Sequence, residues 1–234
     1  MTVTELLMAD PHPGGEADPA GEVIALQDAT VEGPRGTVFG PVTAESAAPI
    51  TVVTGVRGSG RTSLLLALSG RMRLTGGEAS TLGERSPAAI RRSSGIAGFA
   101  EIDALEPAVT VGATLRERLS WAMPWYRRTP RVGPELCREL LEPAFGAECE
   151  APDPGTLVRD LAPAQEFLLR IALALIDGPE ILFVDDFDAL RDPADRRTAA
   201  LRLDAIAAAG IPVVLATSDP GDAALFADVT RIAL

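Results

Sequence analysis

The residues most suggestive of chemistry lie in the glycine-rich segment Gly55–Ser63, GVRGSGRTS. An apolar, β-branched run precedes this segment, and an apolar segment with helical spacing follows it. Glycines in such a turn let backbone N–H groups point inward around phosphate oxygens, and the N-terminus of the following helix adds a positive dipole. The spacing matches the phosphate-loop pattern G-x-x-x-x-G-K-[ST] at every position except the lysine. It therefore predicts a phosphate-binding loop made of Gly55, Val56, Arg57, Gly58, Ser59, Gly60, Arg61, Thr62 and Ser63.

Two residues of this loop carry the most specific expectations. The hydroxyl of Thr62 is placed to ligate Mg²⁺, as the pattern requires. Arg61 stands in the lysine position and keeps the charge, but its planar fork is longer and cannot act as a compact point charge between β- and γ-phosphates. All 21 basic residues of the chain are arginine, so any mechanism that needs a catalytic lysine is absent or altered. The alternative interpretation of the segment is a plain glycine turn between a strand and a helix.

Composition narrows the function classes further. The 234 residues include 21 basic and 33 acidic side chains, and the net charge of −12 disfavours nucleic acid or anionic lipid as the main partner. The single histidine, His12, lies in a Pro/Gly-rich leader, which argues against histidine-based catalysis and histidine-ligated zinc. Cys137 and Cys149 imply no disulfide framework and fit a reducing cytoplasm. No apolar run reaches the roughly 18 residues that span a bilayer, so a membrane role requires a partner.

Alternating strand and helix patterns position these residues. Residues 1–20 are predicted to be a disordered leader, and 21–234 a single domain into which helical residues, about 105–165, are inserted. Strands are expected over 22–31, 36–45, 50–56, 75–83, 181–186 and 211–219, and helices over 61–72, 110–123, 134–145, 164–176 and 192–210. Buried strands that alternate with helices predict a parallel sheet covered on both faces, and hence an α/β fold.

The order of the motifs resembles that of the ATP-binding cassette (ABC) ATPase family. The phosphate loop, TGGEASTLGE, TVGATL, LAPAQEFLLRIALALIDGPEILFVDD, DPADRR and ATSDP follow one another as the corresponding segments do in that family, over nearly the whole chain after the leader. The resemblance implies a P-loop NTPase with a RecA-like parallel sheet core, an antiparallel β subdomain and an α-helical subdomain. It also implies ATP and Mg²⁺ as cofactors.

The resemblance assigns roles to four polar residues outside the loop. Asp185 corresponds to the Walker B aspartate that holds Mg²⁺ through water, and Asp186 to the neighbouring glutamate that polarises the attacking water. Asp186 is one methylene shorter than that glutamate, so its reach is poor. Glu101 takes the place of the Q-loop glutamine that senses Mg²⁺ and the γ-phosphate, and its carboxylate could still ligate the metal although it repels phosphate. Ser218 takes the place of the switch histidine. Alternatively, Asp185 and Asp186 are only an acidic strand end, and Glu101 a surface acid.

This chain departs furthest from the family pattern at the signature sequence. In the family, LSGGQ supplies a hydroxyl and an N–H group to the γ-phosphate bound by the opposite subunit of a dimer. The matching residues have no serine hydroxyl at Ala162 and no N–H at Pro163, although proline suits the first turn of a helix. No tyrosine or phenylalanine stands near Val31, where the family stacks the adenine. The signature segment here consists of Leu161, Ala162, Pro163, Ala164 and Gln165.

Three functions fit these features to different extents. The favoured one is an ATP-binding subunit of an ABC transporter complex with impaired hydrolysis, docked on a membrane-spanning permease or a similar protein, and a second ABC subunit is a further candidate partner. Its expected location is cytoplasmic, peripheral to the inner face of the cell membrane through that partner. The alternative is a non-hydrolysing regulatory or scaffold module on the same fold. An unrelated P-loop enzyme, such as a small-molecule kinase, is disfavoured by the co-linear motifs.

Overall fold

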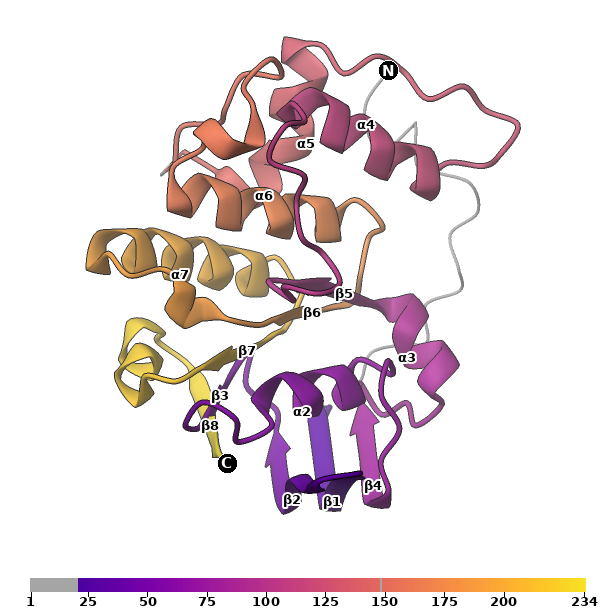
Figure 1. Cartoon of the computed structure of the whole chain (residues 1–234), viewed down its shortest axis with the longest axis vertical. Coiled ribbons are helices and arrows are strands. Elements are labelled where there is room, and N and C mark those ends of the chain that lie inside the picture. The colour runs from indigo at the N-terminus through magenta and orange to yellow at the C-terminus, as the bar shows by residue number, and fades with distance from the viewer. Residues whose placement is uncertain (1–20, 148) are drawn as a thin grey trace.

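Two sheets of different kinds organise residues 21–147 and 149–234, the part of the chain that the computed structural model describes (Figure 1). The antiparallel sheet has the order β2-β1-β4 and comprises β1 (Ile24–Gly33), β2 (Gly36–Ser46) and β4 (Gly76–Thr81). The parallel sheet has the order β5-β6-β7-β3-β8 and comprises β3 (Ile50–Thr54), β5 (Ser94–Ala97), β6 (Ile181–Val184), β7 (Val213–Thr217) and β8 (Val229–Ala233). The expected leader, residues 1–20, lies outside the described residues.

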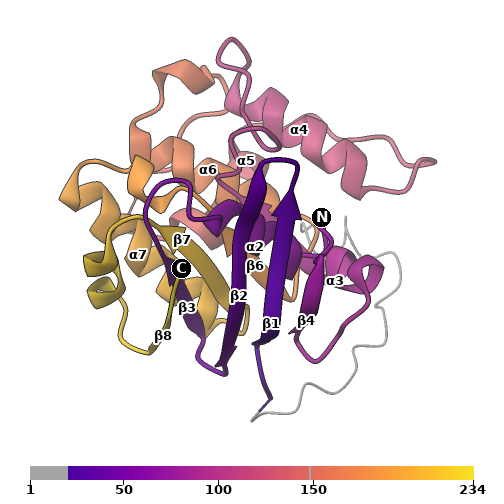
Figure 2. The ribbon, with the colours of Figure 1, turned by 60° about the horizontal axis from the view of Figure 1, so that its bottom comes forward.

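Helices cover both faces of the parallel sheet. Figure 1 shows α6 and α7 on one face, with α4 and α5 beyond them. Helix α2 lies on the other face, between the two sheets. Figure 2 shows the antiparallel sheet lying in front of α2. The helices are α2 (Arg61–Leu68), α3 (Pro87–Ser93), α4 (Val111–Ala122), α5 (Pro134–Phe145), α6 (Pro163–Leu175) and α7 (Pro193–Ala208). Three short 3₁₀ helices are η1 (Val158–Asp160), η2 (Phe187–Ala189) and η3 (Pro220–Leu225).

Alternation along the central strands explains why both faces need cover. Successive side chains of a strand point to opposite faces, so an entirely apolar strand must be buried on both. In β6, Leu182 packs into the core formed with α6 and α7, whereas Phe183 packs into the core formed with α2 and β1. Val52 and Val53 of β3 divide in the same way. The apolar sequence of β3 therefore suits a buried strand between β7 and β8, and the segment that follows β3 begins at the end of that strand.

The expected α/β fold is confirmed, including the parallel sheet, the antiparallel β sheet and the helices. The predicted strands and helices all appear, mostly shortened at their ends. One α-helix and two strands were not predicted, namely α3, β5 and β8, and neither were the three short 3₁₀ helices. The proposed helical insertion over about 105–165 contains α4, α5 and η1, and its status as a separate subdomain stays a prediction.

Candidate functional site

The glycines of the segment Gly55–Ser63 shape a tight turn between β3 and α2. Gly58 and Gly60 have φ of +84° and +92°, a backbone conformation that side chains with a Cβ rarely adopt. A Cβ on Gly60 would lie 2.4 Å from the carbonyl oxygen of Val38, because β2 backs the loop closely. A Cβ on Gly55 would lie 2.3 Å from Ser59 Oγ. The loop can therefore keep its path only with glycine at these positions.

The inner surface of this loop has unused capacity for an anion. Ser59 Oγ is buried and has no hydrogen-bond partner among the described residues. Helix α2 begins at Arg61 with no side-chain cap and no acidic residue in its first turn. The first N–H groups of a helix have no partner within it and carry the positive end of the helix dipole. An orphaned hydroxyl beside such a helix end fits phosphate oxygens.

Thr62 and Asp185 meet below the loop. Asp185 follows the last residue of β6 and is 7% exposed, and its N–H donates to the Ala97 carbonyl at 2.9 Å. Burial raises the pKa of the Asp185 carboxyl, and a hydrogen bond from the Thr62 side chain acts in the opposite direction. A hydroxyl beside a carboxylate suits Mg²⁺, which usually takes only one or two protein ligands and completes its shell with phosphate and water. Accordingly, residues 21–147 and 149–234 contain no cluster of three or more His, Cys, Asp or Glu side chains arranged for a metal.

The other predicted polar residues lie around the same edge of the sheet. Asp186 is exposed and has φ of +53°, so the chain turns sharply after Asp185. A cavity of about 220 Å³ lies beside Asp185 and Asp186, and Pro163 of α6 also lines it. Glu101 is exposed on the turn after β5 and does not line this cavity. The structure thus gathers the two aspartates and the start of α6, but leaves Glu101 outside.

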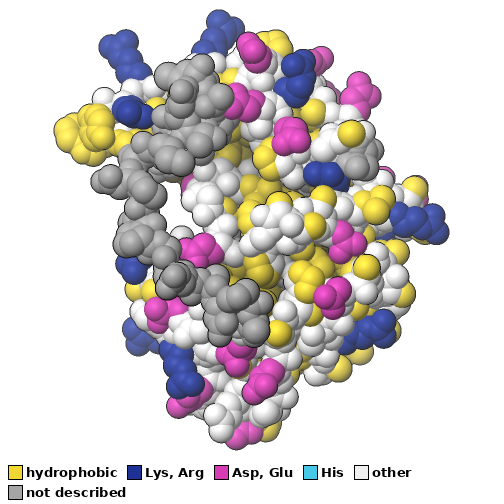
Figure 3. Space-filling view, turned by 180° about the vertical axis from the view of Figure 1, so that it is seen from behind, with side chains coloured by type: hydrophobic (Ala, Val, Ile, Leu, Met, Phe, Trp, Pro, Cys, Tyr) yellow, Lys and Arg dark blue, Asp and Glu magenta, His cyan; other side chains and the backbone are white. Residues whose placement is uncertain are grey.

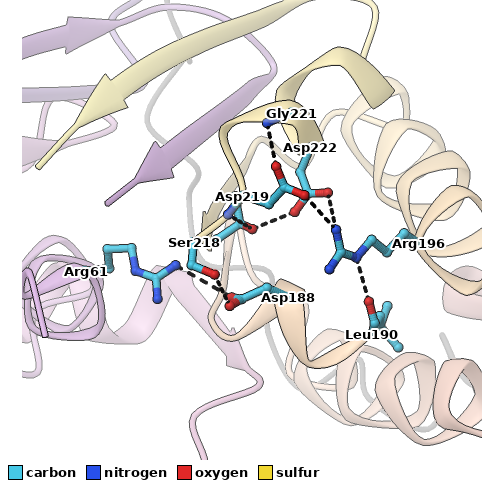
Figure 4. Close-up of polar contacts among 9 residues, drawn as sticks. Arg61, Asp188, Leu190, Arg196, Ser218, Asp219, Gly221 and Asp222 are labelled. Carbon is cyan, nitrogen blue, oxygen red and sulfur yellow. Dashed lines mark hydrogen bonds and ion pairs between the residues drawn. The ribbon is translucent and has the colours of Figure 1, made fainter. Parts of the chain in front are cut away.

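Arg61 and Ser218 converge on one carboxylate, that of Asp188 in η2 (Figure 4). Arg61 Nη1 lies 3.6 Å from Asp188 Oδ1, and the Ser218 hydroxyl donates a short hydrogen bond to Asp188 Oδ2. The side chains of Arg61 and Asp188 are 13% and 9% exposed. Burial acts to raise the pKa of the Asp188 carboxyl, but hydrogen bonds from Ser218 and the charge of Arg61 outweigh it and hold that pKa below its ordinary value. Asp188 is therefore an anion at neutral pH.

A second arginine fixes the loops that carry Asp188 and Ser218. Arg196 of α7 donates to the Leu190 carbonyl at 2.5 Å and lies 3.0 Å from both Asp219 and Asp222 (Figure 4). Asp222 is buried and also accepts a hydrogen bond from Thr217 at 2.5 Å. Because Leu190 follows η2 and Asp222 belongs to η3, Arg196 ties the segments after β6 and β7 together.

The segment Leu161–Gln165 forms the start of α6. Ala162 is the N-cap residue, with an extended backbone, and Pro163 is the first helical residue. The Ala162 N–H donates to Gln165 Oε1 at 3.1 Å, and Gln165 Nε2 donates to the Glu150 carbonyl at 3.0 Å. Ala162 offers no side-chain oxygen in return, so only half of a capping box is present. The glutamine of this segment thus fixes the helix start.

Sequence reasoning missed three residues of this arrangement, namely Asp188, Arg196 and Asp222. One signal could have found Asp188, because it lies just past the carboxyl end of a parallel strand, where ligand-binding residues gather. Arg196 and Asp222 gave no comparable signal, since their contacts join segments far apart in the sequence. The long-range pairing became visible only once β6 and β7 were found side by side.

Solved structures show which class of protein has this architecture. The ADP conformation of MJ1267, described as an ATP-binding cassette of an ABC transporter, matches with a TM-score of 0.71 at 14% identity, covering 90% of this chain and 87% of that one. The dimeric bacterial ABC transporter cassette MJ0796 matches with a TM-score of 0.67 at 20% identity, covering 90% and 94%. CbiO1 from Clostridium perfringens, part of the complex cbiONQ, gives a TM-score of 0.70 at 17% identity, with 90% and 84% covered. The chain has the ATP-binding cassette fold.

Curated proteins resemble the chain in sequence as well. The Fe(3+) ions import ATP-binding protein FbpC 1 of Rhodococcus jostii is 31% identical over 209 residues, 83% of this chain and 53% of that protein. The ribose import ATP-binding protein RbsA of Cereibacter sphaeroides is 31% identical over 199 residues, 83% of this chain and 36% of that protein. The chain spans about half the length of FbpC 1 and less of RbsA, and no protein-family model matches it. The resemblance to ABC ATP-binding subunits, inferred from the motifs, is confirmed.

Proposed function

We propose that this chain is the ATP-binding subunit of an ABC-type transporter complex, binding Mg-nucleotide at its altered phosphate loop and hydrolysing ATP slowly. The observation that carries the proposal is the glycine loop that follows β3 of the parallel sheet, with an orphaned Ser59 hydroxyl inside it and the Thr62–Asp185 contact below it. The curated relatives support it, because each is named an import ATP-binding protein.

The residues of the loop divide the work of holding the nucleotide. The N–H groups at the start of α2 and the Ser59 hydroxyl would hold phosphate oxygens, and the Arg61 guanidinium would balance their charge. Thr62 and Asp185 are the residues that would hold Mg²⁺, which neutralises phosphate charge when it is bound. Asp186 is the remaining carboxylate that could orient a water molecule, and its shorter side chain makes it a poor base.

Several features together support slow hydrolysis. Ser218 is engaged by Asp188, and its short side chain cannot replace the reach of an imidazole. Ala162 and Pro163 offer neither a hydroxyl nor an N–H to a phosphate on a facing subunit. Removing one preorganised donor typically lowers a rate by about 10²–10³, and such losses overlap rather than multiply. The same features favour the alternative of a non-hydrolysing regulatory or scaffold module.

A groove beside the turn after β5 supports docking on a partner protein. The groove has a volume of about 450 Å³, and Ile102, Leu105 and Trp121 form its apolar lining, with Arg118 and Arg170 among its charged residues. Ile102 and Trp121 are 55% and 68% exposed and line the same groove, and apolar side chains that are exposed together mark interaction sites. We infer that a membrane-spanning partner inserts apolar side chains here, so that the chain resides at the cytoplasmic face of the membrane. Among the described residues, no helix combines the length and the apolar character needed to cross a bilayer.

The projecting loop between α4 and α5 extends this exposed apolar surface. Trp125 and Tyr126 are 95% and 68% exposed, and Arg128 is exposed beside them. Seen from behind, this loop projects at the upper left, with hydrophobic and arginine side chains at its tip (Figure 3). The loop adds aromatic contact area of the kind that protein interfaces favour.

Calorimetry with Mg-ATP, Mg-ADP and the metal-free nucleotides tests the nucleotide-binding part of the proposal. We expect weak binding that requires Mg²⁺, and we expect Thr62→Ala to remove the Mg²⁺ dependence. Thr114→Ala is the matched control, because that hydroxyl donates to the Thr110 carbonyl in α4 and is not part of the loop. A wild-type protein that binds neither nucleotide at millimolar concentration would contradict the proposal and favour a scaffold.

A further inference from the structure

Asp188 is an unusual neighbour for a phosphate-binding loop. Its side chain is 9% exposed, and its Oδ1 atom is buried without a hydrogen-bond partner among the described residues. The facing atom, Arg61 Nη1, is also buried and lacks a hydrogen-bond partner. At 3.6 Å the two atoms attract each other as charges but are too far apart for a good hydrogen bond. A buried guanidinium and a buried carboxylate thus face each other with unused hydrogen-bonding capacity.

The position of this pair relative to bound phosphates follows from the loop. The side chain at position 61 stands where the phosphate-loop pattern has the lysine that reaches the β- and γ-phosphates. The guanidinium at the end of that side chain lies 3.6 Å from the Asp188 carboxylate. The carboxylate therefore lies toward the far end of the phosphate chain, where a γ-phosphate would meet the guanidinium.

Ser218 keeps the carboxylate in this place. Its hydroxyl donates to the Oδ2 atom, and Arg196 anchors the flanking segments through Leu190 and Asp222 (Figure 4). Because η2 and η3 are held from two sides, Asp188 cannot withdraw without breaking these contacts. A third phosphate would take up the guanidinium's free N–H but would have to lie against a fixed anion.

We propose that Asp188 is a specificity-determining residue that makes the loop select a nucleoside diphosphate over a nucleoside triphosphate. This inference rests on the proposed nucleotide-binding function and adds a preference within it. Like charges held close together in a partly desolvated site cost several kcal/mol, whereas the shorter diphosphate avoids the encounter. Arg61 then serves both the β-phosphate and Asp188, and the site is most stable with the γ position empty.

Calorimetric titration of the full chain with Mg-ADP and Mg-ATP tests this preference. In the wild type we expect ATP to bind no more tightly than ADP. Asp188→Asn keeps the shape and the contact with Ser218 but removes the charge, and we expect it to raise ATP affinity by about tenfold or more, with ADP affinity changing by less than about threefold. Glu78→Gln is the matched control, since it also removes a carboxylate paired with an arginine, Arg85, at an exposed site on β4. This control leaves the ATP-to-ADP affinity ratio unchanged.

Other outcomes separate the inference from the function on which it rests. A wild type that prefers ATP by tenfold overturns the inference, and this result needs no variant to fold. Equal gains for ATP and ADP in Asp188→Asn, or no gain in a variant whose melting curve shows it folded, also overturn it while nucleotide binding stands. Asp188→Ser provides a second variant for the same comparison. If neither nucleotide binds to any of these proteins, the proposed function itself fails.

Discussion

Arginine at position 61 interacts with the rest of the site differently from lysine. A lysine ammonium is a compact charge on a flexible stem, whereas the guanidinium is a planar fork that reaches further and pairs with carboxylates. In this chain the fork extends to Asp188, 3.6 Å away. A nucleotide bound as proposed would therefore share this cation with its anionic neighbour, Asp188.

Replacing this arginine separates binding from catalysis. Arg61→Lys restores the compact charge and withdraws it from Asp188, and one charge-assisted hydrogen bond contributes about 1.5–3 kcal/mol. We expect ADP affinity to rise by roughly 10- to 150-fold, measured by calorimetry, and ATP affinity to rise less, because the Asp188 carboxylate stays beside the γ position. Phosphate release stays near background, because Ser218 and Pro163 are unchanged.

The control for this substitution is Arg73→Lys, which changes an exposed arginine outside the phosphate loop and leaves affinity unaltered. Steady hydrolysis switched on by Arg61→Lys alone would show that Asp186, Ser218 and the signature segment do not limit the rate.

Asp185 provides a prediction about stability and pH. Burial raises its pKa, so the folded state holds the proton more tightly than the unfolded state, and the ionised carboxylate lowers stability at neutral pH. Asp185→Asn removes that cost, and we expect a gain of about 0.5–2 kcal/mol at pH 7, which is roughly 2–4 °C in melting temperature per kcal/mol for a chain of this size. The gain shrinks as the pH falls and the wild-type carboxyl becomes protonated.

Melting curves between pH 4 and pH 8 measure this effect. Asp160→Asn is the control, because its side chain is 61% exposed and the substitution leaves stability within about 0.5 kcal/mol of the wild type. A destabilised Asp185→Asn at pH 7 would mean that the Thr62 hydrogen bond outweighs the cost of the buried charge.

At the scale of elements, Arg196 connects α7 to the segments after β6 and β7. Its side chain is 21% exposed, and that of its partner Asp222 is 4% exposed. Arg196→Gln leaves a buried carboxylate without its cation, which costs about 3 kcal/mol. We expect urea unfolding to show a loss of that order.

The same substitution loosens the loops that carry Asp188 and Ser218, so nucleotide affinity also changes. Arg85→Gln is the control, because the exposed pair of Arg85 and Glu78 contributes less than about 1 kcal/mol. If Arg196→Gln were as stable as this control, the network in Figure 4 would have no structural role.

Elements with strong local patterns were predictable from the sequence, and those that depend on tertiary pairing were not. The apolar runs of β3, β6 and β7 and the helical spacing of α6 and α7 gave their positions directly. Strand β5 is four residues long and follows α3 without a turn signal, so its strand character comes from pairing with β6. Strand β8 alternates only weakly and gains its place from β3.

The residues of the site also separate into those that local sequence predicts and those that it does not. The loop glycines, Thr62 and Asp185 belong to contiguous motifs, so their roles could be proposed from local sequence. The contact between Arg61 and Asp188 joins residues that are 127 positions apart in the sequence (188 − 61), so no local pattern encodes it. Sequence spacing predicted the phosphate loop, but not the contact of Arg61 with Asp188.

At the scale of the whole molecule, net charge and exposed apolar surface have opposite effects on association with other proteins. The net charge of −12 makes two copies of the chain repel each other at low salt. Most of the exposed large apolar residues lie in the groove lined by Ile102 and Trp121 or on the loop after α4, so the surface best suited to a partner is local. The exceptions among the described residues are Val56 and Leu201. This surface supports the proposed docking on a different protein more than the association of two copies of the chain.

We therefore expect no ATP-driven homodimer, even in Asp186→Asn, which removes the remaining candidate for a general base. In a head-to-tail pair of cassettes, the signature segment of one subunit would face the phosphate loop of the other. Here Ala162 lacks a hydroxyl and Pro163 lacks an N–H, so the facing γ-phosphate finds neither donor. Sizing chromatography of Asp186→Asn with Mg-ATP measures the outcome at low and at high salt, because salt screens the repulsion between copies. If a dimer formed with nucleotide only at high salt, net charge and not the missing donors would be the limit. A dimer that formed only after Ala162→Ser and Pro163→Gly were added to Asp186→Asn would identify the lost donors as the cause.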